Sequence, residues 1–194
     1  CRRFGAEGFA KGKPVKQLYK WFFSVLVKIA YALYRIEGVN ACLLIAPAKL
    51  IPRILRSYGA QVGREVQIHS PLIIHNALEN YAHLTIGDEC YIGRAVLLDL
   101  TERIDLEDRV TLSMRVSLLT HCDVGRAKVK AFLPDFKAPI RIRSDSYLGA
   151  GALVVAGVHM GACSAVGAGS VVLESIGDRE LHGGTPAKKI RDFR

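Results

Sequence analysis

The chain has 194 residues, half of them hydrophobic, which is enough for one domain with a sizeable core and excludes a disordered polymer. Its formal net charge is +9, and all of that excess lies in residues 1–60, which contain eleven Lys and Arg against two acids. Residues 61–194 contain sixteen bases and sixteen acids. A basic N-terminal third therefore precedes a remainder with no net charge.

Residues 1–60 are predicted to form a basic, amphipathic helical region. Apolar residues recur at helical spacing between Leu18 and Ile36, and a second apolar stretch, 41–56, is interrupted by prolines. The apolar part of the first helix contains Lys28 and is shorter than the roughly 20 residues that span a bilayer. Two compatible roles follow: peripheral contact with an anionic membrane surface, or capping of the domain that comes next.

From Ile86 onward, aliphatic side chains recur every six residues. That period matches neither a helix nor a flat strand, and it predicts a triangular coil in which each side is one hexapeptide. Glycine or an acid often stands at the second position of the hexad, and a small residue, such as Cys90 or Cys122, turns the corner at the fifth. A β-sandwich of short strands is the alternative. The aliphatic positions are Ile86, Ile92, Leu98, Leu106, Leu112, Leu118, Ile142, Leu148, Val154, Met160, Val166 and Val172.

The coil is predicted over residues 61–177, followed by a C-terminal tail over 178–194. Its phase breaks most strongly between Leu118 and Ile142, which are 24 residues apart. Residues 123–139 show neither hexad spacing nor a helical stripe, so we predict a loop extruded from the coil. Loops on a rigid scaffold are where binding residues tend to lie.

His121 stands where the regular coil ends and this loop begins. A neutral imidazole there can remove a proton from an attacking hydroxyl or amine, because the pKa of an unperturbed histidine lies near the working pH. The alternative for a lone histidine is a structural role. The other histidines are His69, His75, His83, His159 and His182.

Several segments, taken in order, resemble the hexapeptide-repeat acyltransferases, particularly the galactoside, maltose and polysaccharide O-acetyltransferases. These segments are 110–121, which ends in the Thr-His pair, then 139–142, 147–152, 166–172 and 184–191. The resemblance covers roughly residues 62–191. It implies a mainly β fold, the left-handed parallel β-helix, and acetyl transfer from acetyl-CoA. A homotrimer, the natural closed arrangement of a triangular coil, would place the sites in grooves between copies.

Carried over position by position, the resemblance implies that His121 is the catalytic base. It also implies that small residues at 149–151 and 167–169 line the slot for the pantetheine arm of coenzyme A. Lys188 and Arg191 match positions that meet its phosphate-bearing end, for which their charge is suited. The predicted slot residues are Gly149, Ala150, Gly151, Gly167, Ala168 and Gly169.

Departures from the family pattern concern the acceptor and some coenzyme contacts. The sugar acetyltransferases commonly have an Asn in the coil before the histidine coil, and residues 94–98 contain none. Asp99 is the nearest polar group that could orient an acceptor hydroxyl, and Ser113 is the second candidate for acceptor binding. Residues 173–175 and Tyr147 also differ from the family's usual Thr-Lys-Asp and Trp.

The resulting hypothesis is an acetyl-CoA-dependent O-acetyltransferase that acts on a saccharide or glycan-precursor hydroxyl in polysaccharide biosynthesis. N-acetylation of an amino sugar differs only in the attacking atom. A metal hydratase resembling the γ-type carbonic anhydrases is a second class, but the histidines lack its ligand spacing, so no metal is expected. A non-catalytic scaffold that kept the coil is the third.

Cysteine usage and charge placement give two further expectations. The five cysteines are odd in number and show no Cys-x-x-Cys spacing, which predicts reduced thiols and a cytoplasmic location. The basic residues lie among apolar ones on predicted helices, with no recognised nucleic-acid motif, so we expect no nucleic-acid partner.

Overall fold

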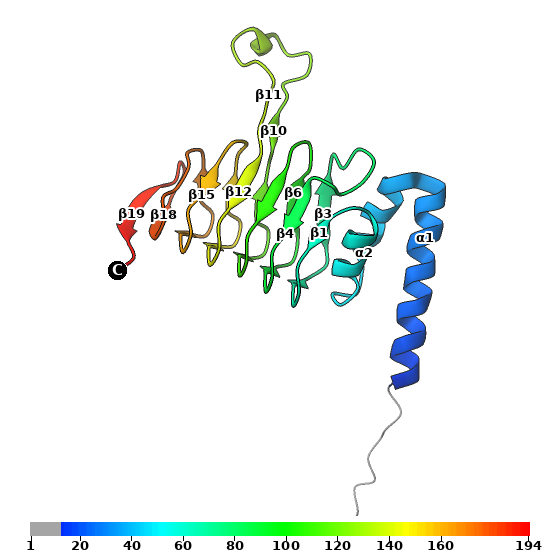
Figure 1. The fold of residues 1–194 in the computed structure, drawn as a ribbon. Helices are drawn as coiled ribbons and strands as arrows, with labels where there is room; N and C mark the ends of the chain where they lie inside the picture. Colours follow the sequence, from blue (N-terminus) through cyan, green and yellow to red (C-terminus); the bar gives the residue numbers. More distant parts are fainter. Residues whose placement is uncertain (1–12) are drawn as a thin grey trace, which may run out of the picture.

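The structure is a computed structural model that describes residues 13–194, with side chains described from residue 18 onward. Three sheets wind into one coil, with helices at its N-terminal end and one loop projecting from its side (Figure 1). The predicted fold class, a mainly β parallel β-helix with N-terminal helices and an extruded loop, is confirmed.

Each side of the coil is one sheet, and the chain visits the three sheets in turn. The first sheet contains β1 (Gln61–Val62), β4 (Leu84–Ile86), β7 (Ile104–Leu106), β12 (Ile140–Ile142) and β15 (His159–Met160). The second contains β2 (Gln67–Ile68), β5 (Tyr91–Ile92), β8 (Thr111–Leu112), β13 (Tyr147–Leu148), β16 (Ala165–Val166), β18 (Glu180–Gly183) and β19 (Lys188–Asp192). The third contains β3 (Leu72–His75), β6 (Val96–Asp99), β9 (Ser117–Leu118), β14 (Leu153–Val154) and β17 (Val171–Val172). Pairing within the sheets is parallel except between β18 and β19.

The hexad aliphatic side chains form the axis of the coil. In the second sheet, Ile92, Leu112, Leu148 and Val166 are register partners in successive coils, so like stacks on like. All twelve positions predicted from the spacing are at most 2% exposed. Burying one such side chain contributes about 1.5–3 kcal/mol, and the repeat multiplies that gain along the coil.

Glycines at the second hexad position allow neighbouring coils to approach closely. A Cβ built on Gly93 would lie 2.7 Å from the backbone nitrogen of Met114, and one on Gly149 would lie 2.5 Å from that of Ala168. Real Cβ atoms are not found that close to backbone, so a side chain at either position would push two coils apart. The corner composition predicted from the sequence therefore has a steric cause.

Two helices precede the coil. Helix α1 (Lys13–Leu43) is interrupted at Arg35, whose φ of 53° and ψ of −140° are not helical. Helix α2 (Ile51–Ser57) buries Ile51 and Leu55 completely and packs against β1 and β2, which agrees with the capping role. Within the described residues, neither helix has both the length and the apolar character needed to cross a bilayer.

The chain leaves the coil at β10 (His121–Cys122), which pairs antiparallel with β11 (Phe136–Lys137) as the stem of the projecting loop. A 3-10 turn, η1 (Lys128–Ala131), lies in the part of the loop beyond this stem. Cys122 is therefore exposed, which corrects the expectation that it turns a corner of the coil. The prediction for Cys90 holds, because this residue is 1% exposed.

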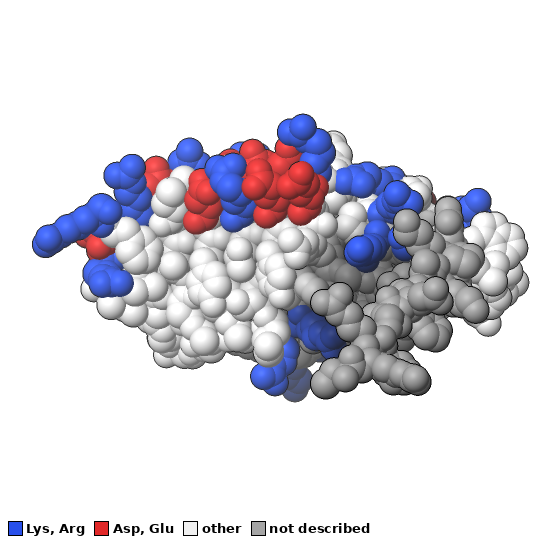
Figure 2. Space-filling view, turned by 90° about the horizontal axis from the view of Figure 1, so that it is seen from below, with Lys and Arg blue, Asp and Glu red and all other residues white. Residues whose placement is uncertain are grey.

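Acidic and basic side chains gather along the edge between the first and second sheets. Three Arg–Asp pairs bridge neighbouring coils there, with N–O distances of 2.7, 2.6 and 3.1 Å: Arg64–Asp88, Arg109–Asp145 and Arg143–Asp178. Figure 2 shows this charge band beside a broad face without charges. Exposed pairs of this kind contribute little each. Glu65, Glu89 and Asp108 on the same edge make no ion pair with a base in the part of the chain that the structure describes.

Candidate active site

His121 and Asp99 meet at the corner between the third and first sheets. Asp99 is the last residue of β6, and His121 begins the first strand outside the coil. Nδ1 of His121 lies 2.6 Å from Oδ2 of Asp99. Because an ionised carboxylate only accepts hydrogen bonds, Nδ1 carries the proton and Nε2 keeps its lone pair. The His121 side chain is 29% exposed against 1% for Asp99, so the imidazole is the accessible partner.

Hydrogen bonds from several elements hold the Asp99 carboxylate. Oδ2 accepts from the backbone nitrogen and hydroxyl of Thr120 at 2.9 and 3.0 Å. Oδ1 accepts from the Thr101 hydroxyl at 2.8 Å and the Asn76 amide at 3.2 Å. Burial by itself would raise the pKa of Asp99, but the bonds from the imidazole and the two threonines outweigh it and hold the pKa at about 2. Asp99 is therefore ionised at neutral pH and orients the His121 ring.

This placement corrects the role predicted for Asp99. Its carboxylate is almost wholly buried behind His121, and both oxygens are already engaged, so it cannot receive an acceptor hydroxyl directly. It is a positioning residue that acts through the imidazole.

His75 is a member of this cluster that the sequence did not reveal. It ends β3, where it is the register partner of Asp99, and its ring is nearly parallel to that of His121, with centroids 6.2 Å apart. Nδ1 of His75 lies 3.9 Å from Oδ1 of Asp99, and the side chain is 62% exposed. The register joins residues 24 apart in the chain, which the hexad period of 18 per coil does not predict.

A pocket of about 290 Å³ opens beside His121, between the coil and the stem of the loop. Its wall combines an imidazole, carboxylates, an ammonium group and one aromatic ring, which suits a polar acceptor with an apolar side. The lining residues are Thr101, His121, Cys122, Asp123, Asp135, Phe136 and Lys137. Lys137 is tied to Glu102 at 3.0 Å, which fixes the stem against the coil.

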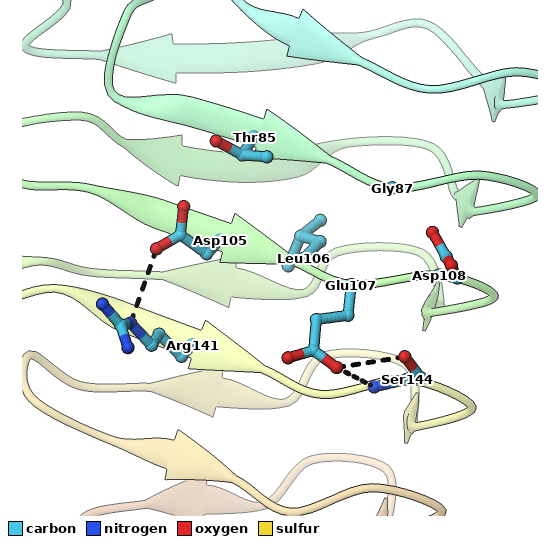
Figure 3. A pocket seen from close by; sticks show the side chains of 8 residues that line it. All are labelled: Thr85, Gly87, Asp105, Leu106, Glu107, Asp108, Arg141 and Ser144. Carbon is cyan, nitrogen blue, oxygen red and sulfur yellow. Dashed lines mark hydrogen bonds and ion pairs between the residues drawn. The ribbon is translucent and has the colours of Figure 1, made fainter.

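A larger hollow, of about 460 Å³, lies on the outer face of the first sheet and is unrelated to this cluster (Figure 3). Its acids already have partners. Asp105 pairs with Arg141 at 3.5 Å, and Glu107 accepts bonds from the backbone and hydroxyl of Ser144, both at 3.0 Å. Asp108 accepts a bond from the backbone nitrogen of Asp88 at 2.8 Å. With no free nucleophile or base in it, this hollow does not compete with His121 as a catalytic centre.

The residues predicted to line the coenzyme slot lie at a different corner, between the second and third sheets. Residues 149–151 connect β13 to β14, and residues 167–169 connect β16 to β17 one coil later. The two turns are joined by a bond from the nitrogen of Gly169 to the oxygen of Ala150, at 2.9 Å. Gly151 and Gly169 have φ values of 71° and 67°, and the space beside both is open.

The C-terminal segment reaches this same corner. The nitrogen of Gly184 donates to the Ser170 hydroxyl at 3.0 Å, and the strand that follows carries Lys188 and Arg191 on its exposed surface. Ser113, between β8 and β9, also stands at this corner, where its hydroxyl lies 3.2 Å from that of Tyr147. Within one chain, the predicted slot and Ser113 are therefore separated from His121 by the width of the third sheet.

No group of three His, Cys, Asp or Glu side chains within the described part of the chain is arranged to hold a metal ion.

Comparison with known proteins supports a shared fold. No protein-family model matches the chain. A hexapeptide-repeat-containing acetyltransferase from Vibrio cholerae is 22% identical, with a TM-score of 0.70 over 89% of this chain and 93% of that one; its structure in complex with acetyl-CoA also matches, with a TM-score of 0.65 over 97% and 94%. A maltose O-acetyltransferase from Clostridium difficile is 17% identical, with a TM-score of 0.68 over 94% and 90%.

A short stretch also resembles a curated relative in sequence. Over 71 residues, 37% of this chain, it is 38% identical to the 2,3,4,5-tetrahydropyridine-2,6-dicarboxylate N-acetyltransferase of Clostridium perfringens. The match spans 30% of the length of that enzyme. The predicted resemblance to hexapeptide-repeat acetyltransferases is thus confirmed, and these proteins include transferases to both oxygen and nitrogen.

Proposed function

We propose that the protein transfers an acetyl group from acetyl-CoA to a hydroxyl of a saccharide or glycan precursor, with His121 as general base. The observation that carries the proposal is the His121–Asp99 pair, whose partly exposed imidazole lines the pocket beside the stem of the loop. Nε2 removes the proton from the hydroxyl as its oxygen attacks the thioester carbonyl. When the tetrahedral intermediate collapses, the imidazolium returns the proton to the departing thiolate of coenzyme A. Asp99 stabilises that imidazolium throughout.

The separation of the predicted slot from His121 supports a homotrimer whose sites lie between copies. A second copy that packs along the third sheet can bring its slot corner to the first copy's histidine corner. The outward side chains of that sheet favour packing, because Ile73, Leu97, Leu153 and Val171 are uncharged and half-buried. In this arrangement Gly149 to Gly151, Gly167 to Gly169, Lys188 and Arg191 hold the coenzyme, and Ser113 reaches the acceptor from the neighbouring copy.

The test is acetyl transfer by His121→Ala, measured as release of free thiol from acetyl-CoA in a screen of glycan acceptors. Loss of a general base should lower turnover on the order of 100-fold or more while acetyl-CoA still binds by calorimetry. His159→Ala, an exposed histidine on the first sheet, is the matched control and should keep the wild-type rate. A His121→Ala rate near that of the wild type would refute the role.

Mixing two inactive variants tests whether the site is shared. Ala168→Trp blocks the predicted slot, and His121→Ala removes the base. If the site lies between copies, trimers reassembled from both variants recover about a quarter of the wild-type rate by random pairing. If each site belongs to one chain, mixing recovers nothing.

An amine acceptor is the second candidate, favoured by the N-acetyltransferase among the relatives. Matched acceptors that differ only in one hydroxyl or amino group at the same sugar carbon separate the two. Faster turnover on the amino sugar would assign N-acetylation.

A further inference from the structure

Helix α1 carries a row of large apolar side chains that the described structure leaves uncovered. The α1 row consists of Leu18, Trp21, Phe22, Leu26, Ile29 and Leu33. Their exposed fractions range from 38% for Leu26 to 69% for Leu33. Because a helix advances about 100° per residue, these six positions share one side of the rod. An apolar stripe of this length in water usually marks a contact surface.

The opposite side of the same helix is the one that packs on the protein. Phe23 and Val27 are 4% and 3% exposed and belong to the hydrophobic core, and Ala30 and Tyr31 pack against it. Capping the coil therefore uses only one side of α1. A helix that is apolar on both sides needs a second apolar environment, and the coil does not supply it.

Basic side chains lie on the same helix as the α1 row and just beyond it. Lys20, Lys28 and Arg35 on α1, with Lys49 and Arg53 beyond it, are exposed and make no ion pair with an acid in the described part of the chain. Glu37 is the single acid in residues 13–57. The surface that covers the row must therefore combine hydrocarbon with negative charge.

We propose that the α1 row docks on an anionic phospholipid bilayer, with the helix lying in the interfacial region. The aliphatic and aromatic side chains then enter the boundary between headgroups and acyl chains, Trp21 sits at the headgroup level, and the lysines and arginines meet lipid phosphates. Figure 1 shows α1 running past the edge of the coil, on the side away from the projecting loop, so the coil does not block a flat surface from reaching it.

Charge complementarity selects the bilayer over a second copy of the chain. A second copy would have to offer a net negative surface to the cations around the row. Residues 61–194 contain sixteen bases and sixteen acids, and residues 1–60 are basic, so a second copy brings no excess of acids.

The experiment is co-sedimentation of the full chain with vesicles of phosphatidylglycerol and phosphatidylcholine, compared with phosphatidylcholine alone. The wild type should bind the anionic vesicles, and binding should weaken with salt. Replacing three row residues together, Phe22→Ser, Ile29→Ser and Leu33→Ser, should lower the partition coefficient on the order of 100-fold or more. The charge variant Lys20→Glu with Lys28→Glu should lower it about tenfold or more.

The matched control replaces three apolar residues elsewhere that are at least as exposed, Leu78→Ser, Phe132→Ser and Leu173→Ser, and should bind as the wild type does. Light scattering without lipid tests the alternative, a contact between copies of the chain. If the row variant forms smaller oligomers while its vesicle binding is unchanged, the row belongs to that contact and the proposal is overturned. Wild-type protein that ignores anionic vesicles would also overturn it. Neither readout depends on turnover, so the result is independent of the role of His121.

Discussion

The regular coil and the histidine corner are built from the same chain under opposite rules. In the coil, each side chain repeats the one below it: aliphatic groups fill the axis, and glycines such as Gly93 let the backbones touch. At the corner between the third and first sheets the repeat stops, and Asp99, Thr101, Thr120 and His121 form a partly buried polar network. The repeat supplies rigidity, and its interruption supplies the polar groups of the candidate site.

The difference shows why a charged group can be buried safely at this position. A carboxylate inside a protein is costly unless hydrogen bonds replace the water that it loses. Asp99 accepts hydrogen bonds from three neighbouring segments of the coil, and these bonds together replace the hydration that the carboxylate loses. A rigid scaffold is therefore the condition for a fixed imidazole.

The largest expected effect is on the stability of the coil and comes from a substitution on its axis. Leu98→Ala removes a completely buried side chain from the axis and should lower the free energy of unfolding by about 2–5 kcal/mol, since the stacked coils cannot close the cavity. Tyr91→Ala, at an exposed position on the outer side of β5, should cost about 1 kcal/mol or less. Urea unfolding followed by circular dichroism measures both. Equal losses at the two positions would contradict the inward and outward alternation.

The next largest effect is expected from a substitution at Asp99, which disrupts the polar network at the histidine corner and leaves the coil intact. Asp99→Asn keeps the shape of the side chain but no longer holds the proton on Nδ1 of His121 or stabilises the imidazolium. Turnover should fall on the order of 100-fold, with little change in acetyl-CoA affinity. Initial rates over a range of acceptor and acetyl-CoA concentrations separate the two parameters. Unchanged turnover would show that Asp99 does not orient the base.

Asp99→Asn should also change how the free energy of unfolding depends on pH. The folded pKa of Asp99 is about 2, below its ordinary value of 3.8, so ionisation of this group stabilises the fold above pH 4 and that stabilisation is lost as the pH falls toward 2. The contribution is about 2 kcal/mol. Between about pH 5 and pH 2.5, the wild type should therefore lose more unfolding free energy than Asp99→Asn does. Parallel acid dependence of the two proteins would argue against a buried, ionised Asp99.

The smallest expected effect comes from a substitution at His75, which tests whether this residue belongs to the candidate catalytic cluster. His75 stacks on His121 but approaches Asp99 only at 3.9 Å, outside hydrogen-bond distance. His75→Asn should change turnover only a few-fold, because the removed ring stacks on His121 without bonding to Asp99. His159→Asn, at an exposed histidine on the first sheet, is the control. A loss as large as that of His121→Ala would give His75 a direct part in proton transfer.

Much of the fold could be predicted from the sequence because the hexad period depends only on residues close together in the chain. Six-residue spacing places a side chain on the axis regardless of what lies farther along the chain, so the buried positions from Ile86 to Val172 could be predicted individually. His121 could be singled out because it borders the loop. Asn76 and His75 could not, because the coils that place them opposite Asp99 are longer than the repeat. Asp99 was found but given the wrong partner, since spacing says nothing about which neighbour buries a carboxylate.

By itself, the sequence determined the coil, its axis and the point where the loop leaves it, because each follows from short-range periodicity and sterics. Only the tertiary structure decided that Asp99 lies behind His121, that His75 joins them, and that the predicted coenzyme slot stands at another corner. These relations depend on register between coils, and register is set by the lengths of irregular turns and by packing across the whole stack.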